Sequence, residues 1–250
     1  MLCSDMERID DGAEAAISQD DAVAPMTAER ADPRSRIISA ALEVFAAEGF
    51  ELATLRAITD KAGVNIAAVN YYFGSKDELL RTVLEVRMVP YVAARLKLLD
   101  LACQQSGPEG PTLEAIVEAL VRPMVRLSRD PSGGRSLIRM ILQARARPRE
   151  ETVRVFVEGV DPVVHRFIDA FSRALPHVPR DEIFWRYNFA LGATMQVLTD
   201  SDPNAMRLKR LSGGLCDTDN DEIVIDELTR FISAGFRAPP TGTAAQRASA

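Results

Sequence analysis

Two histidines and three cysteines are the side chains in this 250-residue chain that are best suited to bind a metal or to act as nucleophiles. His165 and His177 are twelve positions apart and have no cysteine partner. Cys3, Cys103 and Cys216 are scattered and match neither a zinc site nor a disulfide framework. We therefore predict free thiols in a reducing compartment, no metal, no cofactor and no enzymatic activity.

Residues 54–80, TLRAITDKAGVNIAAVNYYFGSKDELL, show a pattern of a different kind. Thr54 is a favoured N-cap for a first short helix, whose apolar residues fall on one face. Gly63 can end that helix in a left-handed conformation, and Asn65 can cap a second helix that ends at Gly74. Two short helices joined by a glycine turn make a helix-turn-helix, and the second helix is of a size to enter a DNA major groove.

The elements around this stretch predict an all-α protein. A strong helix over residues 33–48 precedes the helix-turn-helix, and a fourth helix runs from Ser75 to about Cys103. Pro90 lies inside this fourth helix, where we expect a kink. Further helices are expected over residues 112–129, 135–146, 150–175, 180–200 and 222–236, which makes about nine helices and no strand.

The charge is unevenly distributed. The chain has a net charge of −6, but residues 1–32 alone hold nine acidic and two basic side chains. We expect these residues and the Pro-, Thr- and Ala-rich residues 238–250 to be disordered tails. Residues 33–90 hold seven basic and seven acidic side chains, so no basic field indicates a nucleic-acid partner.

Apolar runs are short throughout the chain. None reaches the roughly 18 residues of a transmembrane helix, and the first thirty residues lack the basic start and apolar core of a signal peptide. We therefore expect a cytoplasmic protein without membrane contact. Met26 could also start a shorter chain.

The order of motifs from residue 34 to about residue 84 resembles the N-terminal domain of TetR-family transcriptional regulators. The features in register are Gly49-Phe50, Thr54, Ile58, Ala62-Gly63-Val64, Tyr71-Tyr72-Phe73 and Lys76. The resemblance implies a three-helix DNA-binding domain at residues 33–80 and a helical ligand-binding and dimerisation domain at residues 81–237. It also implies a homodimeric repressor that binds a palindromic operator and is released by a ligand acting on the fourth helix.

The resemblance also suggests which side chains contact DNA. The candidates are Thr54, Arg56, Asn65, Ile66, Ala67, Ala68, Asn70, Tyr71, Tyr72 and Lys76. Residues 65–68 start the recognition helix, where base edges are reached, and an asparagine could hydrogen-bond adenine. Thr54, Arg56, Tyr71 and Lys76 are expected to hold phosphates. Thr59 and Asn70 depart from the usual family pattern, and the hydroxyl of Thr59 needs a hydrogen-bond partner.

The C-terminal half suggests a small hydrophobic ligand. LVRPMVRLS followed by GGRSLIRMI is similar to TetR-family members that respond to fatty acids or acyl-CoA esters. The candidate ligand-binding residues are Met124, Met140, Phe156, Phe167, Phe171, Trp185 and Asn188. An apolar core without a ligand explains these residues equally well. Arg122, Arg139 and Arg186 could pair with an anionic head group or extend to the surface.

Residues 180–200 are apolar on nearly every side, which implies burial both by the subunit and by a partner. With residues 222–236 they are expected to form a four-helix bundle between two copies. The candidate dimer residues are Phe184, Leu191, Met195, Leu228 and Phe231. An all-α scaffold that binds a ligand or partner, but not DNA, remains the alternative because residues 33–90 carry no net charge.

Overall fold

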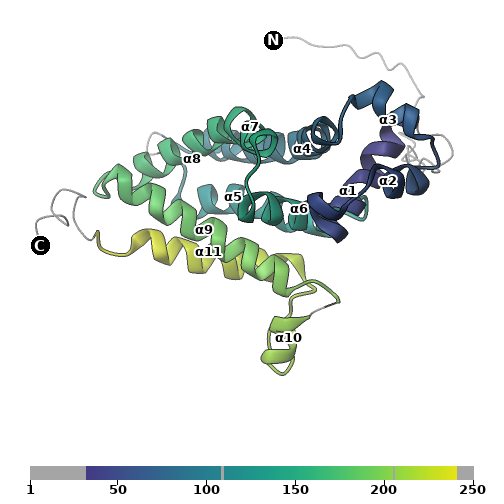
Figure 1. The fold of residues 1–250 in the computed structure, drawn as a ribbon. Coiled ribbons are helices and arrows are strands. Elements are labelled where there is room, and N and C mark those ends of the chain that lie inside the picture. Colours follow the sequence, from purple (N-terminus) through teal and green to yellow (C-terminus); the bar gives the residue numbers. More distant parts are fainter. Residues whose placement is uncertain (1–31, 108–109, 205, 241–250) are drawn as a thin grey trace, which may run out of the picture. The chain divides into compact units, whose positions relative to one another are not determined.

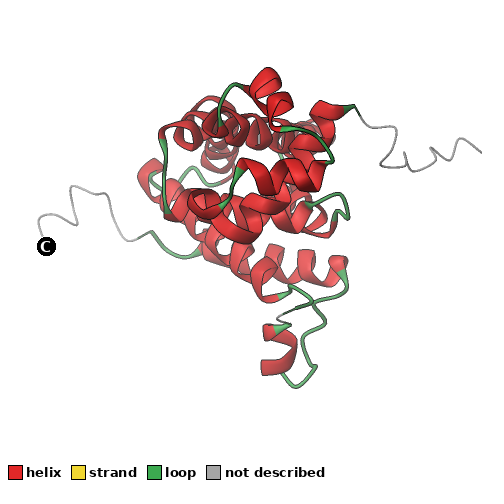
Figure 2. Cartoon of the chain, turned by 45° about the vertical axis from the view of Figure 1, so that its right-hand side comes forward, coloured by secondary structure: helices red, strands yellow, loops and turns green. Residues whose placement is uncertain are grey.

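The computed structural model describes residues 32–107, 110–204 and 206–240. These residues form helices joined by loops, without a strand among them (Figure 1, Figure 2). The prediction of an all-α fold is confirmed. Most of the two predicted tails, at residues 1–31 and 241–250, lies outside the described residues. Within the described part of the chain, no helix is long and apolar enough to cross a membrane.

Three consecutive helices form the N-terminal unit: α1 (Pro33–Leu52), α2 (Leu55–Ala62) and α3 (Ile66–Phe73). Gly49, at φ +76°, interrupts α1 where the sequence predicted its end, and one further turn follows it. Gly63, at φ +64°, ends α2 in the left-handed conformation that a glycine adopts without strain. Ile58 and Val69 are fully buried between these helices and fix α3 against α1 and α2.

Helix α4 (Lys76–Gln105) connects this unit to the rest of the chain. Ser75 caps it by accepting a hydrogen bond of 3.1 Å from the backbone N–H of Glu78. The Glu78 carboxylate pairs with Arg81 in the next turn, so it is engaged within α4. The helix continues through Pro90 as a single element, although Pro90 has no N–H to donate to the helix.

The remaining helices follow with short connections. They are α5 (Leu113–Arg129), α6 (Gly134–Ala146), α7 (Glu150–Val155), the π-helical turn η2 (Phe156–Val160), α8 (Asp161–Ala174), α9 (Arg180–Asp200), α10 (Arg207–Leu211) and α11 (Asp221–Arg237). The stretch expected as helix over residues 150–175 is therefore divided into α7, the π-helical turn and α8, and the π-helical turn ends just before Asp161. Helix α10 lies in a segment predicted as loop, because five residues are too few to show a helical period.

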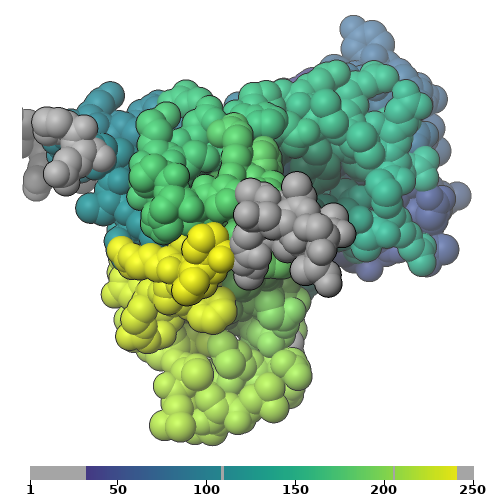
Figure 3. Space-filling view, turned by 90° about the vertical axis from the view of Figure 1, so that its left-hand side faces the viewer, coloured from purple at the N-terminus to yellow at the C-terminus, as the bar shows by residue number. Residues whose placement is uncertain are grey.

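The C-terminal helices pack around α5. Helix α5 lies against α4 on one side and α11 on the other, and α9 packs on α8 and α11. Helix α6 packs on α1, so the C-terminal helices contact the N-terminal unit directly. In the space-filling view, α11 (yellow) is at the surface beside the green segment that contains α8 and α9 (Figure 3).

Candidate DNA-binding surface and ligand cavity

Five of the side chains predicted to contact DNA line one shallow depression, namely Asn65, Ala67, Ala68, Tyr71 and Tyr72. Arg56, Asn65, Ile66, Ala67 and the other candidates are exposed, apart from Ala68 and Lys76, which are half-buried. Tyr71 is 82% exposed, whereas Tyr72 is less so and packs edge-on against it. Residues of α3 and of the end of α2 line this depression.

Several polar groups among these candidates already have partners. Thr54 accepts a hydrogen bond of 3.1 Å from Ala57 N and caps α2. Asn65 Oδ1 accepts one of 2.9 Å from Ala68 N and caps α3, which leaves its NH₂ to face outward. Asn70 makes no side-chain hydrogen bond within the described residues, so both its amide oxygen and nitrogen are available. A bidentate contact with adenine needs both groups, and Asn70 therefore suits it better than Asn65.

The cations among these candidates differ in their readiness to hold a phosphate. Arg56 is highly exposed and lies 3.8 Å from Asp60, at the limit of an ion pair. Lys76 Nζ lies 4.3 Å from the centre of the Phe50 ring and donates to Glu51 O at 3.5 Å. Lys76 must leave this position on α1 before it can reach a phosphate. The buried hydroxyl of Thr59, which required a partner, donates to Arg56 O at 3.0 Å.

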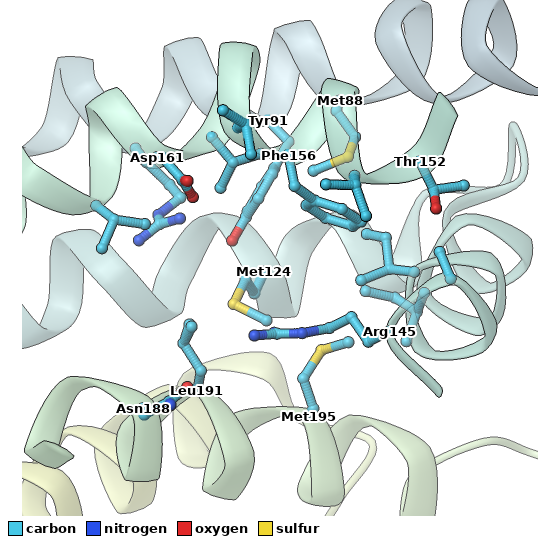
Figure 4. Close-up of a pocket in the computed structure, with 18 of the residues that line it drawn as sticks. Met88, Tyr91, Met124, Arg145, Thr152, Phe156, Asp161, Asn188, Leu191 and Met195 are labelled. Carbon is cyan, nitrogen blue, oxygen red and sulfur yellow. The ribbon is translucent and has the colours of Figure 1, made fainter. Parts of the chain in front are cut away.

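A cavity of about 430 Å³ lies between α4, α5, α6, the α7–η2–α8 segment and α9 (Figure 4). Its wall is mostly apolar, with Met88, Met124 and Met195 from three different helices. The polar and charged lining residues are Tyr91, Arg95, Arg145, Thr152, Asp161, Tyr187 and Asn188. An apolar cavity with a few polar groups is the usual form of a small-molecule site.

Arg95 on α4 is the most deeply buried of these charged residues, at 2% exposure. Its Nη2 donates a hydrogen bond of 2.8 Å to Tyr187 Oη on α9. Its guanidinium centre lies 4.7 Å from the ring centre of Phe167 and 5.5 Å from that of Tyr91. Burial raises the pKa of Tyr91 to about 12, so this phenol is neutral.

Two family models match the chain. Residues 37–83 match the model described as bacterial regulatory proteins of the tetR family, and residues 118–235 match the tetracyclin repressor-like C-terminal domain. The first match covers the helix-turn-helix, and the second covers most of α5 and the later helices, including those that enclose the cavity together with α4. The chain belongs to the TetR family.

Curated relatives match between a quarter and a half of this TetR-family chain. The regulator SrpR of Pseudomonas putida is 51% identical over 63 residues, which are 25% of this chain and 30% of SrpR. The dual regulator CecR of Shigella flexneri is 33% identical over 120 residues, or 48% of this chain and 44% of CecR. The chain thus spans less than half the length of the curated relatives it matches.

Solved TetR-family structures share the fold over most of the chain. The fatty acid degradation regulator FadR from Bacillus halodurans aligns with a TM-score of 0.53 and 16% identity, over 81% of this chain and 99% of that one. PfmR from Thermus thermophilus aligns with a TM-score of 0.54 and 16% identity, over 83% and 100%. At this identity the likeness establishes the fold alone.

The predicted ligand residues separate into two groups in this TetR-family fold. Met124, Phe156 and Asn188 line the cavity, whereas Met140, Phe167 and Phe171 are buried in the core without lining it. Trp185 belongs to neither group, because it is 58% exposed and does not line this cavity. Trp185 follows a residue that lines the cavity, and one step along a helix turns a side chain by about 100°.

The predicted dimer residues are mostly turned into the subunit. Phe184, Leu191 and Met195 line the cavity, and Leu228 is buried in the core. Phe231 is 70% exposed on α11. The large apolar side chains that α9 and α11 expose outside the cavity are Trp185, Phe189, Ile223 and Phe231. The sequence indicated that Trp185 and Phe189 share a face of α9, because residues four apart lie on one face of a helix.

Arg95 was not named from the sequence as a residue that could bind an anionic ligand. The three arginines that were named all have carboxylate partners in the structure. Arg122 pairs with Glu118 and Glu222, Arg139 with Asp202, and Arg186 with Glu182. A signal for Arg95 was present, since Tyr91, Arg95 and Leu99 recur every four residues and are all buried. A charged residue in the middle of an apolar stripe is a candidate for a functional role.

Proposed function

We propose that this TetR-family chain is a transcriptional regulator, most simply a repressor, that binds a palindromic operator as a homodimer and leaves it when a ligand fills the cavity. The observation that carries the proposal is the exposed face of α3, where Asn70 and Tyr71 project from a helix that is capped at Asn65 and held by the buried Val69. A rigid, exposed second helix is what major-groove recognition requires.

The expected contacts combine base readout with a few phosphate contacts. Asn70 is suited to adenine, and the exposed Ile66 and Ala67 can contact a thymine methyl group. Tyr71 and Arg56 can hold phosphates. Helix α3 itself has no lysine or arginine, so each half-site should bind weakly. Operator affinity therefore depends on the presence of two copies.

The second copy is proposed to dock on α9 and α11. Trp185 and Phe189 are exposed on α9, and Ile223 and Phe231 on α11, although these helices are packed against each other within the subunit. Two such pairs form a four-helix bundle when two copies associate. A two-fold dimer presents its recognition helices to half-sites separated by about 34 Å, one turn of DNA.

Ligand control is proposed to act through helices that line the cavity and also touch the DNA-binding unit. Helix α4 lines the cavity at Met88, Tyr91 and Arg95 and begins directly after α3. Helix α6 lines it at Ile138 and packs on α1. In one conformation of the dimer, the spacing of the two recognition helices does not fit the operator. A ligand that binds this conformation more tightly lowers the affinity for DNA, at most by the ratio of its affinities for the two conformations. The ligand proposed is a small hydrophobic molecule, with fatty acids and acyl-CoA esters as the classes to test. The protein is proposed to meet both partners in the cytoplasm.

Fluorescence anisotropy of labelled duplex DNA tests the proposal. The duplex is taken from upstream of the protein's own gene, and the full chain is titrated at several salt concentrations. We expect tight binding that weakens steeply with salt, and a large loss in an Asn70→Ala/Tyr71→Ala variant. Leu215→Ala is the matched control, because Leu215 is exposed in the loop before α11. Absence of salt-sensitive binding would favour the scaffold without DNA binding, and equal affinity for a scrambled duplex of the same composition would contradict recognition of an operator.

A further inference from the structure

Arg95 is a buried charge without a counter-charge. It is 2% exposed, and within the described residues its hydrogen bonds go to the hydroxyl groups of Tyr187, at 2.8 Å, and of Tyr91, and not to a carboxylate. The Arg95 Nε atom is buried and has no hydrogen-bond partner. Burying a guanidinium without an anion is costly, and aromatic faces compensate for only part of that cost.

Other arginines of the C-terminal helices differ from Arg95 because they have carboxylate partners. Arg186 is nearly as buried as Arg95, but it pairs with Glu182 at 2.7 Å and donates to Ala238 O at 2.8 Å. Arg122 and Arg139 pair with carboxylates at 2.7 and 2.6 Å. The fold therefore supplies anions to its structural arginines. Arg95 lacks one and faces a cavity instead.

The cavity contains one carboxylate, and its position does not meet this need. Asp161 is exposed at the start of α8 and lines the cavity, and among the described residues no ion pair joins it to Arg95. Arg145 from α6 reaches across the cavity between Met124 and Met195 (Figure 4). Two arginines and one aspartate give the lining an excess of positive charge, and an incoming anion is therefore favoured.

We propose that the ligand of this cavity is a small amphipathic anion, whose charged group binds Arg95 at the closed end while its apolar part lies against the methionines and Phe156. This inference deepens the proposed ligand control and rests on it for its biological meaning. Tyr91, Arg95 and Tyr187 are each less than a tenth exposed, whereas Val153, Val157 and Asp161, which also line the cavity, are exposed. The anion therefore enters first and the apolar part follows.

This orientation distinguishes a free carboxylate from its thioester. A carboxylate can accept from both Arg95 Nε and a neighbouring N–H, which would satisfy the buried donor. A CoA thioester places a neutral carbonyl at the same point and a large polar group behind it. A fatty acid fits head-first entry, and an acyl-CoA does not.

The proposed contact would also reach the regulatory helices directly. Arg95 belongs to α4, which starts after the recognition helix, and Tyr187 belongs to α9, which is proposed to form the dimer. An anion that takes over the Arg95 guanidinium competes with its hydrogen bond to Tyr187. Ligand binding would then change the link between α4 and α9 at one identified point.

Isothermal titration calorimetry of the full chain without DNA tests the inference with decanoate, decanol and decanoyl-CoA as probes. We expect wild-type protein to bind decanoate about tenfold or more tightly than decanol. In Arg95→Gln the two affinities should become equal, with decanol affinity little changed. Arg95→Lys should retain part of the preference for the anion. Failure of decanoate to bind more tightly than decanol to wild-type protein overturns the proposal.

The controls separate a ligand contact from a structural role. Loss of a purely structural arginine would weaken decanoate and decanol equally, and that result in Arg95→Gln contradicts the proposal. Arg122→Gln is the matched control and should keep the full preference, because Arg122 has its own carboxylates. If Arg145→Gln removes the preference and Arg95→Gln does not, the anion binds at the other arginine and the assignment is wrong. Tighter, Arg95-dependent binding of decanoyl-CoA would overturn the head-first orientation.

These titrations contain no DNA, so their outcome is independent of the operator experiment. Arg95-dependent decanoate binding together with absent DNA binding would contradict the proposed regulator and leave the anion site standing. Salt-sensitive DNA binding together with no preference for the anion would contradict the anion site and leave the proposed regulator standing.

Discussion

Arg149 Nη2 donates a hydrogen bond of 2.9 Å to Asp77 Oδ1, and so connects the start of α7 to the first turn of α4. The Nη1 atom of Arg149 pairs with Glu51 Oε1 at 2.6 Å, and the guanidinium centre lies 4.1 Å from the centre of the Phe50 ring. The preceding residue, Pro148, lines the cavity. One side chain therefore links the cavity wall to the ends of both helices that hold the recognition helix.

Substitution of Arg149 should reduce the effect of the ligand on operator affinity more than it reduces the affinity for the ligand itself. In Arg149→Met we expect unchanged affinity for a cavity ligand such as decanoate, and a loss of about 0.5–2 kcal/mol in the free energy by which the ligand lowers operator affinity. Anisotropy titrations of operator DNA with and without ligand measure this quantity. Arg154→Met is the control, because Arg154 makes a local, exposed ion pair with Glu150. Equal coupling in wild type and Arg149→Met would show that this contact transmits nothing.

The N-terminus of α6 depends on the absence of a side chain at Gly134. A Cβ there would lie 1.7 Å from the Leu127 carbonyl oxygen. We expect Gly134→Ala to reduce the free energy of unfolding by about 3 kcal/mol or more, because backbone must move to relieve the clash. Gly159→Ala should leave stability unchanged or raise it by about 0.5–1 kcal/mol, because open space surrounds that position. Urea unfolding followed by circular dichroism compares the two variants. Equal stabilities would contradict the close approach of α5 and α6.

The dimer surface can be tested at one exposed residue. Phe231→Asp should convert dimers to monomers and lower operator affinity, because a charge at the centre of an apolar interface cannot be paired. Leu215→Asp should remain dimeric, since Leu215 is 91% exposed and lies off both helices. Sedimentation equilibrium gives the mass directly. A stable Phe231→Asp dimer would move the interface to another surface.

Asn70 and Tyr71 should affect DNA binding in different ways. Asn70→Ala should reduce discrimination at one base pair by about 1–3 kcal/mol and leave other positions unaffected. Tyr71→Phe should weaken binding to all sequences by a similar factor, because a phosphate contact carries no base information. Binding to a set of single-base operator variants measures both effects. A sequence-independent loss in Asn70→Ala would indicate that this residue contacts the backbone.

Local features of the fold were predictable from the sequence because their physical cause is local. The caps at Thr54, Asn65 and Ser75 each accept the backbone hydrogen bond expected of them, from a residue three positions later. Helix α9 was predicted with the bounds that the structure shows. Side-chain oxygens and glycines act on their immediate neighbours, so a short window of sequence contains the whole interaction.

The faces of the helices were harder to predict because they depend on distant residues. Helix α9 is apolar around its circumference, and its period alone could not show that Leu191 faces the cavity while Phe189 faces outward. Arg95 and Tyr187 are brought together from positions 92 residues apart. Neither the direction in which Leu191 points nor the contact between Arg95 and Tyr187 leaves a pattern in a single sequence. Both are needed to define the cavity.

The most direct test of the central claim is selection of random duplex DNA by the full chain, followed by sequencing of the enriched pool. Two α3 helices carried by one dimer should enrich an inverted repeat, with half-sites about 34 Å apart along the duplex. The Phe231→Asp variant should not enrich that repeat. Enrichment of no sequence by the wild-type protein, or of an unpaired half-site that Phe231→Asp selects equally well, would contradict a dimeric regulator.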